Sequence, residues 1–171
     1  MKRFLFIAFL ILLTTHHLFG QENRFEPKKT FEDLIVKAEE LKAESQYDSA
    51  VAIFNFIKDK AESEDDTLYL MKSNLGIASV FFFLQETKVA RNYYRQIIKL
   101  SKAINDSTHL NKSFYGIGGT YQIDDNLDSA FYYYEMTLPY FIREKKDEDV
   151  ALILSNLASL HYRKGEVDLA I

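Results

Sequence analysis

The stretch DNLDSAFYYY, residues 125–134, decides the fold of this chain. It runs from a polar residue, through Leu127, to a small residue, Ala130, and four positions later to a large aromatic one, Tyr134. The alanine recurs at a constant spacing of 40 residues, at Ala50, Ala90, Ala130 and Ala170. This spacing predicts a helical repeat with a 40-residue period.

Further columns align in the same register. Twelve residues before each alanine another small residue recurs, and four after it an aromatic one, at Phe54, Tyr94 and Tyr134. Small side chains allow two helix backbones to approach closely, and large apolar ones fill the space beside them. The predicted unit is therefore a pair of packed helices, whose packing positions are Ala38, Ala50, Ala78, Ala90, Gly118, Ala130, Ala158 and Ala170.

The turns are also visible. Ser45, Gln85, Asp125 and Gly165 stand five residues before the alanines, and Ser, Asp and Gly favour helix ends and turns. Gln85 fits this pattern least well. We expect helices over residues 31–45, 47–61, 67–85, 88–105, 108–124, 127–144, 148–164 and from 167 onward.

These columns resemble the tetratricopeptide repeat, a helix-turn-helix unit of about 34 residues. The chain departs from that family in its longer period and in having no Trp. In the second repeat, residues 73–76 (SNLG) resemble residues 155–158 (SNLA), which offers an alternative register shifted by two residues. The resemblance implies an all-α fold, a right-handed superhelical solenoid of antiparallel helix pairs, with repeats at about 31–66, 67–106, 107–146 and 147–171, the last one truncated.

In this family the first helices of the repeats line a concave groove that receives a peptide or a partner helix. Carrying those positions over gives a mixed aromatic and polar surface suited to recognition. The candidate partner-binding residues are Lys72, Phe82, Lys112, Tyr115, Gln122, Tyr162 and Arg163. The paired Lys and Asn with which some members hold a C-terminal carboxylate are not reproduced.

The N-terminus has the layout of a secretory signal peptide. Lys2 and Arg3 precede ten apolar residues, 4–13, which are too few to span a bilayer that needs about 20. We predict a signal peptide over residues 1–20, a linker over 21–29, and export to the periplasm or the extracytoplasmic face of the inner membrane. An uncleaved membrane anchor is the alternative. A further membrane contact would need a helix beyond Ile171, because the chain ends inside the fourth repeat and resembles the N-terminal part of a longer protein.

The charge and composition of the chain limit the classes of partner that it can bind. Removal of the leader would leave 19 basic against 25 acidic residues, a net charge of about −6, and no basic stripe is visible. The sequence therefore predicts no nucleic-acid binding by this segment. It predicts no cofactor, and the absence of cysteine excludes disulfides.

Three motifs could carry chemistry, but each has a structural explanation that we favour. Residues 116–119 (GIGG) could hold a phosphate, yet they fall where the repeat needs small residues. Asp124, Asn126, Asp128 and Glu135 match positions of a calcium loop, but Ser129 replaces its glycine and the pattern also fits a helix start. His161 occupies an aromatic core column, and no neighbouring ligand pair supports a metal site or a catalytic role.

Two functions remain open. One is a protein–protein interaction scaffold that binds a peptide or partner protein in its groove, without enzymatic activity in this segment. The other is the extracytoplasmic sensory region of a longer membrane signalling protein, a histidine kinase or a helix-turn-helix transcriptional regulator.

Overall fold

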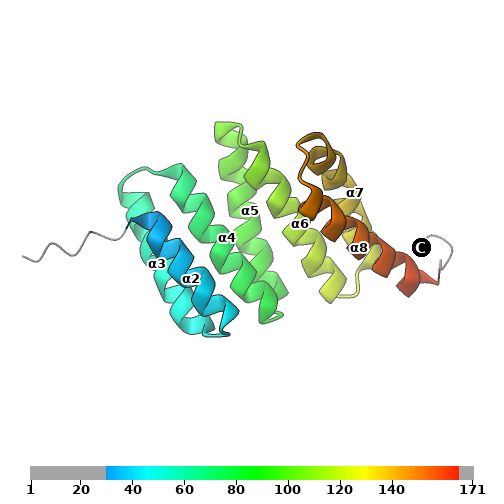
Figure 1. The fold of residues 1–171 in the computed structure, drawn as a ribbon, viewed down its shortest axis with the longest axis horizontal. Helices are drawn as coiled ribbons and strands as arrows, with labels where there is room; N and C mark the ends of the chain where they lie inside the picture. Colours follow the sequence, from blue (N-terminus) through cyan, green and yellow to red (C-terminus); the bar gives the residue numbers. More distant parts are fainter. Residues whose placement is uncertain (1–29, 166–171) are drawn as a thin grey trace, which may run out of the picture. The chain divides into compact units, whose positions relative to one another are not determined.

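The computed structural model describes residues 30–165, and seven helices within that range follow one another in chain order (Figure 1). Each helix packs against the next one in the chain, and over the described residues no strand is formed. The predicted all-α fold of stacked helix pairs is therefore confirmed. The helices are α2 (Phe31–Ala43), α3 (Tyr47–Ser63), α4 (Thr67–Phe83), α5 (Thr87–Ile104), α6 (Ser107–Ile123), α7 (Leu127–Arg143) and α8 (Asp147–Lys164).

The 40-residue period holds for every helix of the described range. α3, α5 and α7 begin at Tyr47, Thr87 and Leu127, and α4, α6 and α8 begin 40 residues apart as well. The alternative register for the second repeat, based on residues 73–76, is therefore wrong. The predicted bounds of these helices agree with the observed ones to within two residues. The signal peptide, the linker and the predicted helix from residue 167 lie outside the described residues.

Each helix is closed by a residue in the left-handed conformation. These residues lie 20 positions apart, so the turn inside a helix pair and the turn between pairs share one geometry. After α4, for example, the Gln85 N–H donates to the Phe82 carbonyl at 3.0 Å and the Glu86 N–H to the Phe81 carbonyl at 2.9 Å. Such bonds satisfy the carbonyls that the end of a helix leaves free. The residues are Ser45, Asp65, Gln85, Asn105, Asp125, Lys145 and Gly165.

The predicted small columns form the contacts between helices. Ala38, Ala50, Ala78, Ala90 and Ala130 are fully buried, and Gly118 is buried too. Their lack of bulk lets the helices of a pair meet closely. Two positions differ in their surroundings: Ala158 in α8 is only half-buried, and Ala170 lies outside the described residues.

The aromatic residues Phe54 of α3 and Tyr94 of α5 pack against the first helix of the following pair. A Cβ added to Gly76 would lie 2.3 Å from the ring of Phe54, and one added to Gly116 would lie 2.3 Å from the ring of Tyr94. Both distances are far below van der Waals contact. Glycine is therefore required at these points of α4 and α6 if the rings keep their positions.

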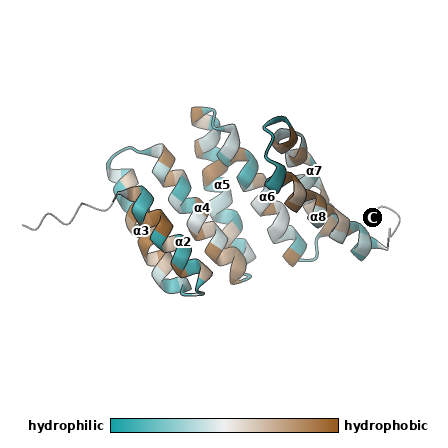
Figure 2. Ribbon diagram, in the orientation of Figure 1, coloured by the Kyte–Doolittle hydropathy of each residue, from teal (hydrophilic) through white to brown (hydrophobic). Residues whose placement is uncertain are grey.

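Polar and apolar residues separate along the helices. The first turn of α8 carries Asp147, Glu148 and Asp149, which complement the positive end of the helix dipole, and the middle of the same helix is hydrophobic (Figure 2). Among the helices between residues 30 and 165, none is long and apolar enough to cross a membrane.

Candidate functional site

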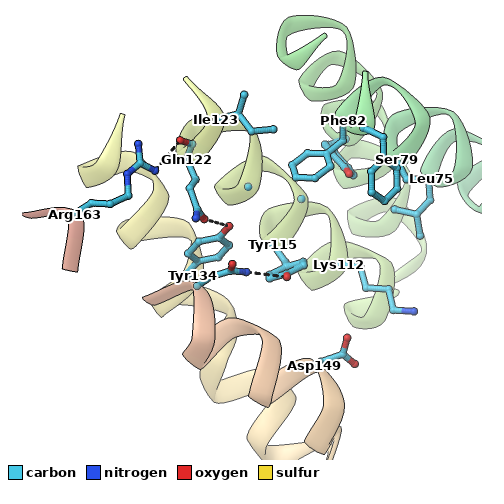
Figure 3. A pocket seen from close by; sticks show the side chains of 15 residues that line it. Leu75, Ser79, Phe82, Lys112, Tyr115, Gln122, Ile123, Tyr134, Asp149 and Arg163 are labelled. Carbon is cyan, nitrogen blue, oxygen red and sulfur yellow. Dashed lines mark hydrogen bonds between the residues drawn. The ribbon is translucent and has the colours of Figure 1, made fainter. Parts of the chain in front are cut away.

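A groove of about 670 Å³ runs across α4, α6 and α8, the first helices of consecutive pairs. α6 forms its base, and α4 and α8 form its two walls (Figure 3). α8 is joined to α6 by two side-chain hydrogen bonds: the Asn156 amide donates to the Tyr115 hydroxyl at 2.9 Å, and Arg163 donates to the Gln122 carbonyl at 3.2 Å. The groove is therefore bounded by connected helices rather than by a loop.

Glycines in α6 open the base of the groove. A Cβ on Gly116 would lie 2.7 Å from the Tyr94 hydroxyl oxygen, and a Cβ on Gly119 would lie 2.8 Å from the Phe82 ring. Without side chains at these two positions, Tyr94 of α5 and Tyr134 of α7 reach the groove from the helix layer beneath. Second-helix residues thus contribute to a surface that the first helices frame.

Three tyrosines, Tyr94, Tyr115 and Tyr134, form what we call the tyrosine floor. The Tyr134 hydroxyl donates to the Gln122 side-chain oxygen at 2.8 Å, and the rings of Tyr115 and Tyr134 lie 5.5 Å apart. Tyr94 is only 5% exposed, and its hydroxyl has no hydrogen-bond partner among the residues that the structure describes. The floor therefore presents to the groove a hydroxyl that pairs with no described residue, although most of Tyr94 is buried.

The tyrosine floor stays uncharged. Burial raises the pKa of Tyr94 and of Tyr134 well above the usual tyrosine range, and nearby tyrosine hydroxyls raise both further. Burial also raises the pKa of Tyr115, which Asn156 lowers and the Asp149 carboxylate raises. At neutral pH all three hydroxyls are protonated and able to donate.

Charged side chains stand at the ends of the groove. Lys112 of α6 and Asp149 of α8 line one end, and neither makes an ion pair or hydrogen bond within residues 30–165. Arg163 lines the other end and donates to the Asp125 carboxylate at 2.6 Å. The lining thus carries two cations and one anion around an aromatic floor.

Five of the seven candidate groove residues line this groove: Phe82, Lys112, Tyr115, Gln122 and Arg163. Lys72 and Tyr162 do not. Lys72 pairs with Glu32 and lies over the ring of Tyr69, whereas Tyr162 is 69% exposed and is not among the lining residues. Sequence analysis missed Tyr94, Tyr134, Asp149 and Asn156; Tyr94 and Tyr134 stand in the aromatic column that it assigned to packing.

The phosphate and calcium motifs have structural roles here. Residues 116–119 lie inside α6, against aromatic rings. Asp124 accepts a hydrogen bond from the Thr87 hydroxyl at 2.8 Å and pairs with Arg91 at 2.6 Å. Burial raises the pKa of Asp124, but these two partners lower it more, so its pKa lies below the usual value. Asn126 caps α7 by accepting from the Ser129 N–H, and no group of acidic or histidine residues suited to a metal ion occurs in the described part of the chain.

His161 packs against an aromatic residue of the preceding helix. Its ring makes an edge contact with Phe131, at 4.6 Å between ring centroids. Phe131 belongs to α7, so the histidine links the last two described helices.

The fold and the groove define a helical-repeat protein, and comparison with known proteins supports this class at the level of structure. No family model matches the chain, and no curated protein matches it by sequence. BtubC (BKLC) from P. vanneervenii is similar in structure, with a TM-score of 0.70 and 20% identity over 81% of this chain and 57% of BtubC.

A second similar structure is the Rap conjugation gene regulator of the plasmid pLS20, solved in complex with the Phr* peptide. It has a TM-score of 0.71 and 16% identity over 96% of this chain and 50% of the regulator. At these identities the likeness shows a shared fold. This chain spans between 50 and 57% of the length of the two proteins.

Proposed function

We propose that this chain is a tetratricopeptide-type interaction scaffold that binds an extended peptide segment of a partner protein in the groove across α4, α6 and α8. The observation that carries the proposal is the groove itself, whose aromatic base is exposed by two helical glycines. Aromatic rings in a concave site supply large contact area at low conformational-entropy loss. That the similar Rap regulator was solved with a peptide is consistent with this use of the fold.

The length of the groove suits a short extended segment. From Lys112 to Ile123, α6 rises roughly 16 Å at 1.5 Å per residue. An extended peptide covers about 3.3 Å per residue, so roughly five residues would lie along the base. We infer no catalytic step, because the lining residues supply hydroxyls and charges for binding but no paired nucleophile and base.

Peptide display tests the proposal. Random peptides selected on the purified chain should bind with an affinity that falls several-fold when two exposed lining residues are truncated, Phe83→Ala and Ile123→Ala. The matched controls are Tyr132→Ala and Met136→Ala, which remove similarly exposed side chains from α7 outside the groove. Equal losses in both sets, or selected peptides that ignore the groove variants, would show that binding occurs elsewhere.

Export of the chain is a separate proposal. The layout of residues 1–20 supports it, and N-terminal sequencing of the protein from fractionated bacterial cells tests it. A periplasmic form that begins near Gln21 is expected. A form that retains Met1 in the membrane fraction would indicate the uncleaved anchor instead. Either form could serve as a free scaffold or as the sensory region of a signalling protein, since both roles use the same groove.

A further inference from the structure

The Tyr94 hydroxyl is the feature of the groove that packing does not explain. Its ring fills the space left by Gly116, but a phenylalanine would fill that space equally, as Phe54 does against Gly76 in the preceding pair. Tyr94 as a residue is only 5% exposed, but its hydroxyl oxygen is accessible from the groove, and it makes no hydrogen bond to another described residue. A hydroxyl at the base of a groove that no described side chain occupies is available to donate a hydrogen bond to a ligand atom.

The groups around this hydroxyl are mostly hydrogen-bond donors. The Tyr115 hydroxyl already accepts from Asn156, so its own proton is available, and it lies close enough to raise the pKa of Tyr94. The oxygen of the Gln122 amide is occupied by Tyr134, which leaves its NH₂ group for a ligand. Lys112 adds an ammonium without an ion-pair partner in the described region. A ligand that fits this set presents acceptor oxygens.

Charge distinguishes a carboxylate from a neutral carbonyl. Arg163 is paired with Asp125, so Lys112 is the lining cation without an ion-pair partner in the described region, and Asp149 carries the negative charge of the lining. An ionised carboxylate accepts at two oxygens, with room for about four hydrogen bonds, whereas a carbonyl accepts at one. Hydrogen bonds to a charged acceptor are also stronger than those between neutral groups.

We propose that the groove recognises an extended, largely apolar peptide through one acidic side chain, whose carboxylate reaches between Gly116 and Gly119 and accepts hydrogen bonds from the hydroxyls of Tyr94 and Tyr115. Lys112 supplies the compensating charge, and the apolar neighbours of the acidic residue pack on Phe82 and Leu75. The inference rests on the proposed peptide-binding function and specifies which peptides the groove selects.

The test uses blocked, fluorescein-labelled pentapeptide pools with Leu, Phe, Ile or Val at the outer positions and Glu, Gln, Ala or Lys at the centre. Fluorescence anisotropy on the purified chain should give about tenfold tighter binding for the Glu pool than for the Gln pool, equivalent to about 1.4 kcal/mol. The preference should weaken as salt is added, because the Lys112 charge is exposed.

Two pairs of variants identify the groups responsible. Tyr94→Phe removes one oxygen without changing the ring, and it should weaken binding of the Glu pool much more than binding of the Ala pool, so that most of the preference for Glu is lost. Tyr93→Phe is the matched control, since Tyr93 stacks on Phe81 and does not line the groove. Lys112→Met should weaken binding of the Glu pool, and Asp149→Asn should strengthen it.

The outcomes separate the two proposals. If the four pools bind alike, or if Tyr94→Phe leaves the Glu preference intact, acid recognition at the tyrosine floor is overturned although peptides still bind. If no pool binds and display also selects no groove-dependent peptide, the binding function fails and the acid preference fails with it.

Discussion

At the scale of single residues, the left-handed position that follows each helix accepts several types of residue. Gly165 adopts φ 80° without strain, yet Gln85 and Lys145 adopt φ 60° and 54° at equivalent points. A residue with a Cβ loses about 1 kcal/mol in this conformation relative to glycine. Sequence analysis identified Gln85 as the residue that fits the turn pattern least well. Its backbone geometry matches that of the other junctions, so the only unfavourable feature is the steric energy of a side chain at positive φ.

Replacing Gln85 with Gly should therefore stabilise the protein by about 0.5 to 1 kcal/mol, since glycine removes the steric cost at positive φ. Urea unfolding followed by circular dichroism measures this change. Lys88→Gly is the control: Lys88 is exposed inside α5, where glycine should destabilise by a similar amount. A gain in both variants would show that the effect is unrelated to the turn.

At the scale of helices, the recurring alanines were sufficient to predict where helices begin and end. They were sufficient because each alanine is needed for a contact within its own helix pair. The same contact recurs in every pair, so the alanine recurs every 40 residues. Ala158 is the exception, since it is only half-buried among the described residues.

Ala50 and Ala52 in α3 test this argument with one residue type. Ala50 is fully buried and Ala52 is exposed, two positions apart on the same helix. Ala50→Leu should overpack the contact between α3 and its neighbours and lower the free energy of unfolding by roughly 1 to 3 kcal/mol. Ala52→Leu should change it by less than about 0.5 kcal/mol. Equal melting temperatures for the two variants would contradict the packing role of the column.

Pro139 interrupts the regular geometry of α7. It lies inside the helix and is exposed, and because proline has no N–H the carbonyl of Glu135 lacks its helical donor. Pro139→Ala should therefore raise the free energy of unfolding, by up to about 3 kcal/mol. The control is Glu135→Ala, which leaves the backbone unchanged and should be nearly neutral. Thermal unfolding that is unchanged by Pro139→Ala would show that neighbouring helices already compensate for the missing bond.

At the scale of the whole molecule, the groove was only half predictable. Its walls and part of its base follow from first-helix positions, so Phe82, Lys112 and Gln122 could be named from the repeat alone. In the tyrosine floor only Tyr115 could be named. Tyr94 could not, because it shares a column with the buried Phe54 and reaches the groove only through Gly116, which belongs to the next helix pair. An alignment of single helix pairs compares residues within a pair, so it cannot reveal a contact between two pairs.

The tyrosine floor also predicts how the protein responds to alkali. The pKa of Tyr94 and of Tyr134 is raised above the usual value near 10, so folding is favoured by their protonated forms. Their contribution to stability is complete below about pH 10 and is lost as the pH rises above it. Tyrosine absorbance should show two of the 11 tyrosines ionising only as the helices unfold.

Substitution separates this effect from general alkaline damage. The double variant Tyr94→Phe/Tyr134→Phe should lose less stability between neutral pH and pH about 11 than the original chain. A matched variant with Phe at Tyr132, which is 62% exposed, should behave like the original. Identical pH profiles for all three proteins would mean that the buried hydroxyls ionise freely in the folded state.

The even spacing of the helix ends has an evolutionary consequence. With a left-handed residue at every twentieth position, a gene segment coding for 40 residues contains one complete pair and its two turns. Duplication or loss of such a segment in frame would join each remaining helix to its neighbour as before, because each pair contacts only adjacent pairs. Recombination could thus lengthen or shorten the peptide site one unit at a time, so that ligand size evolves by copying and ligand chemistry by point mutation.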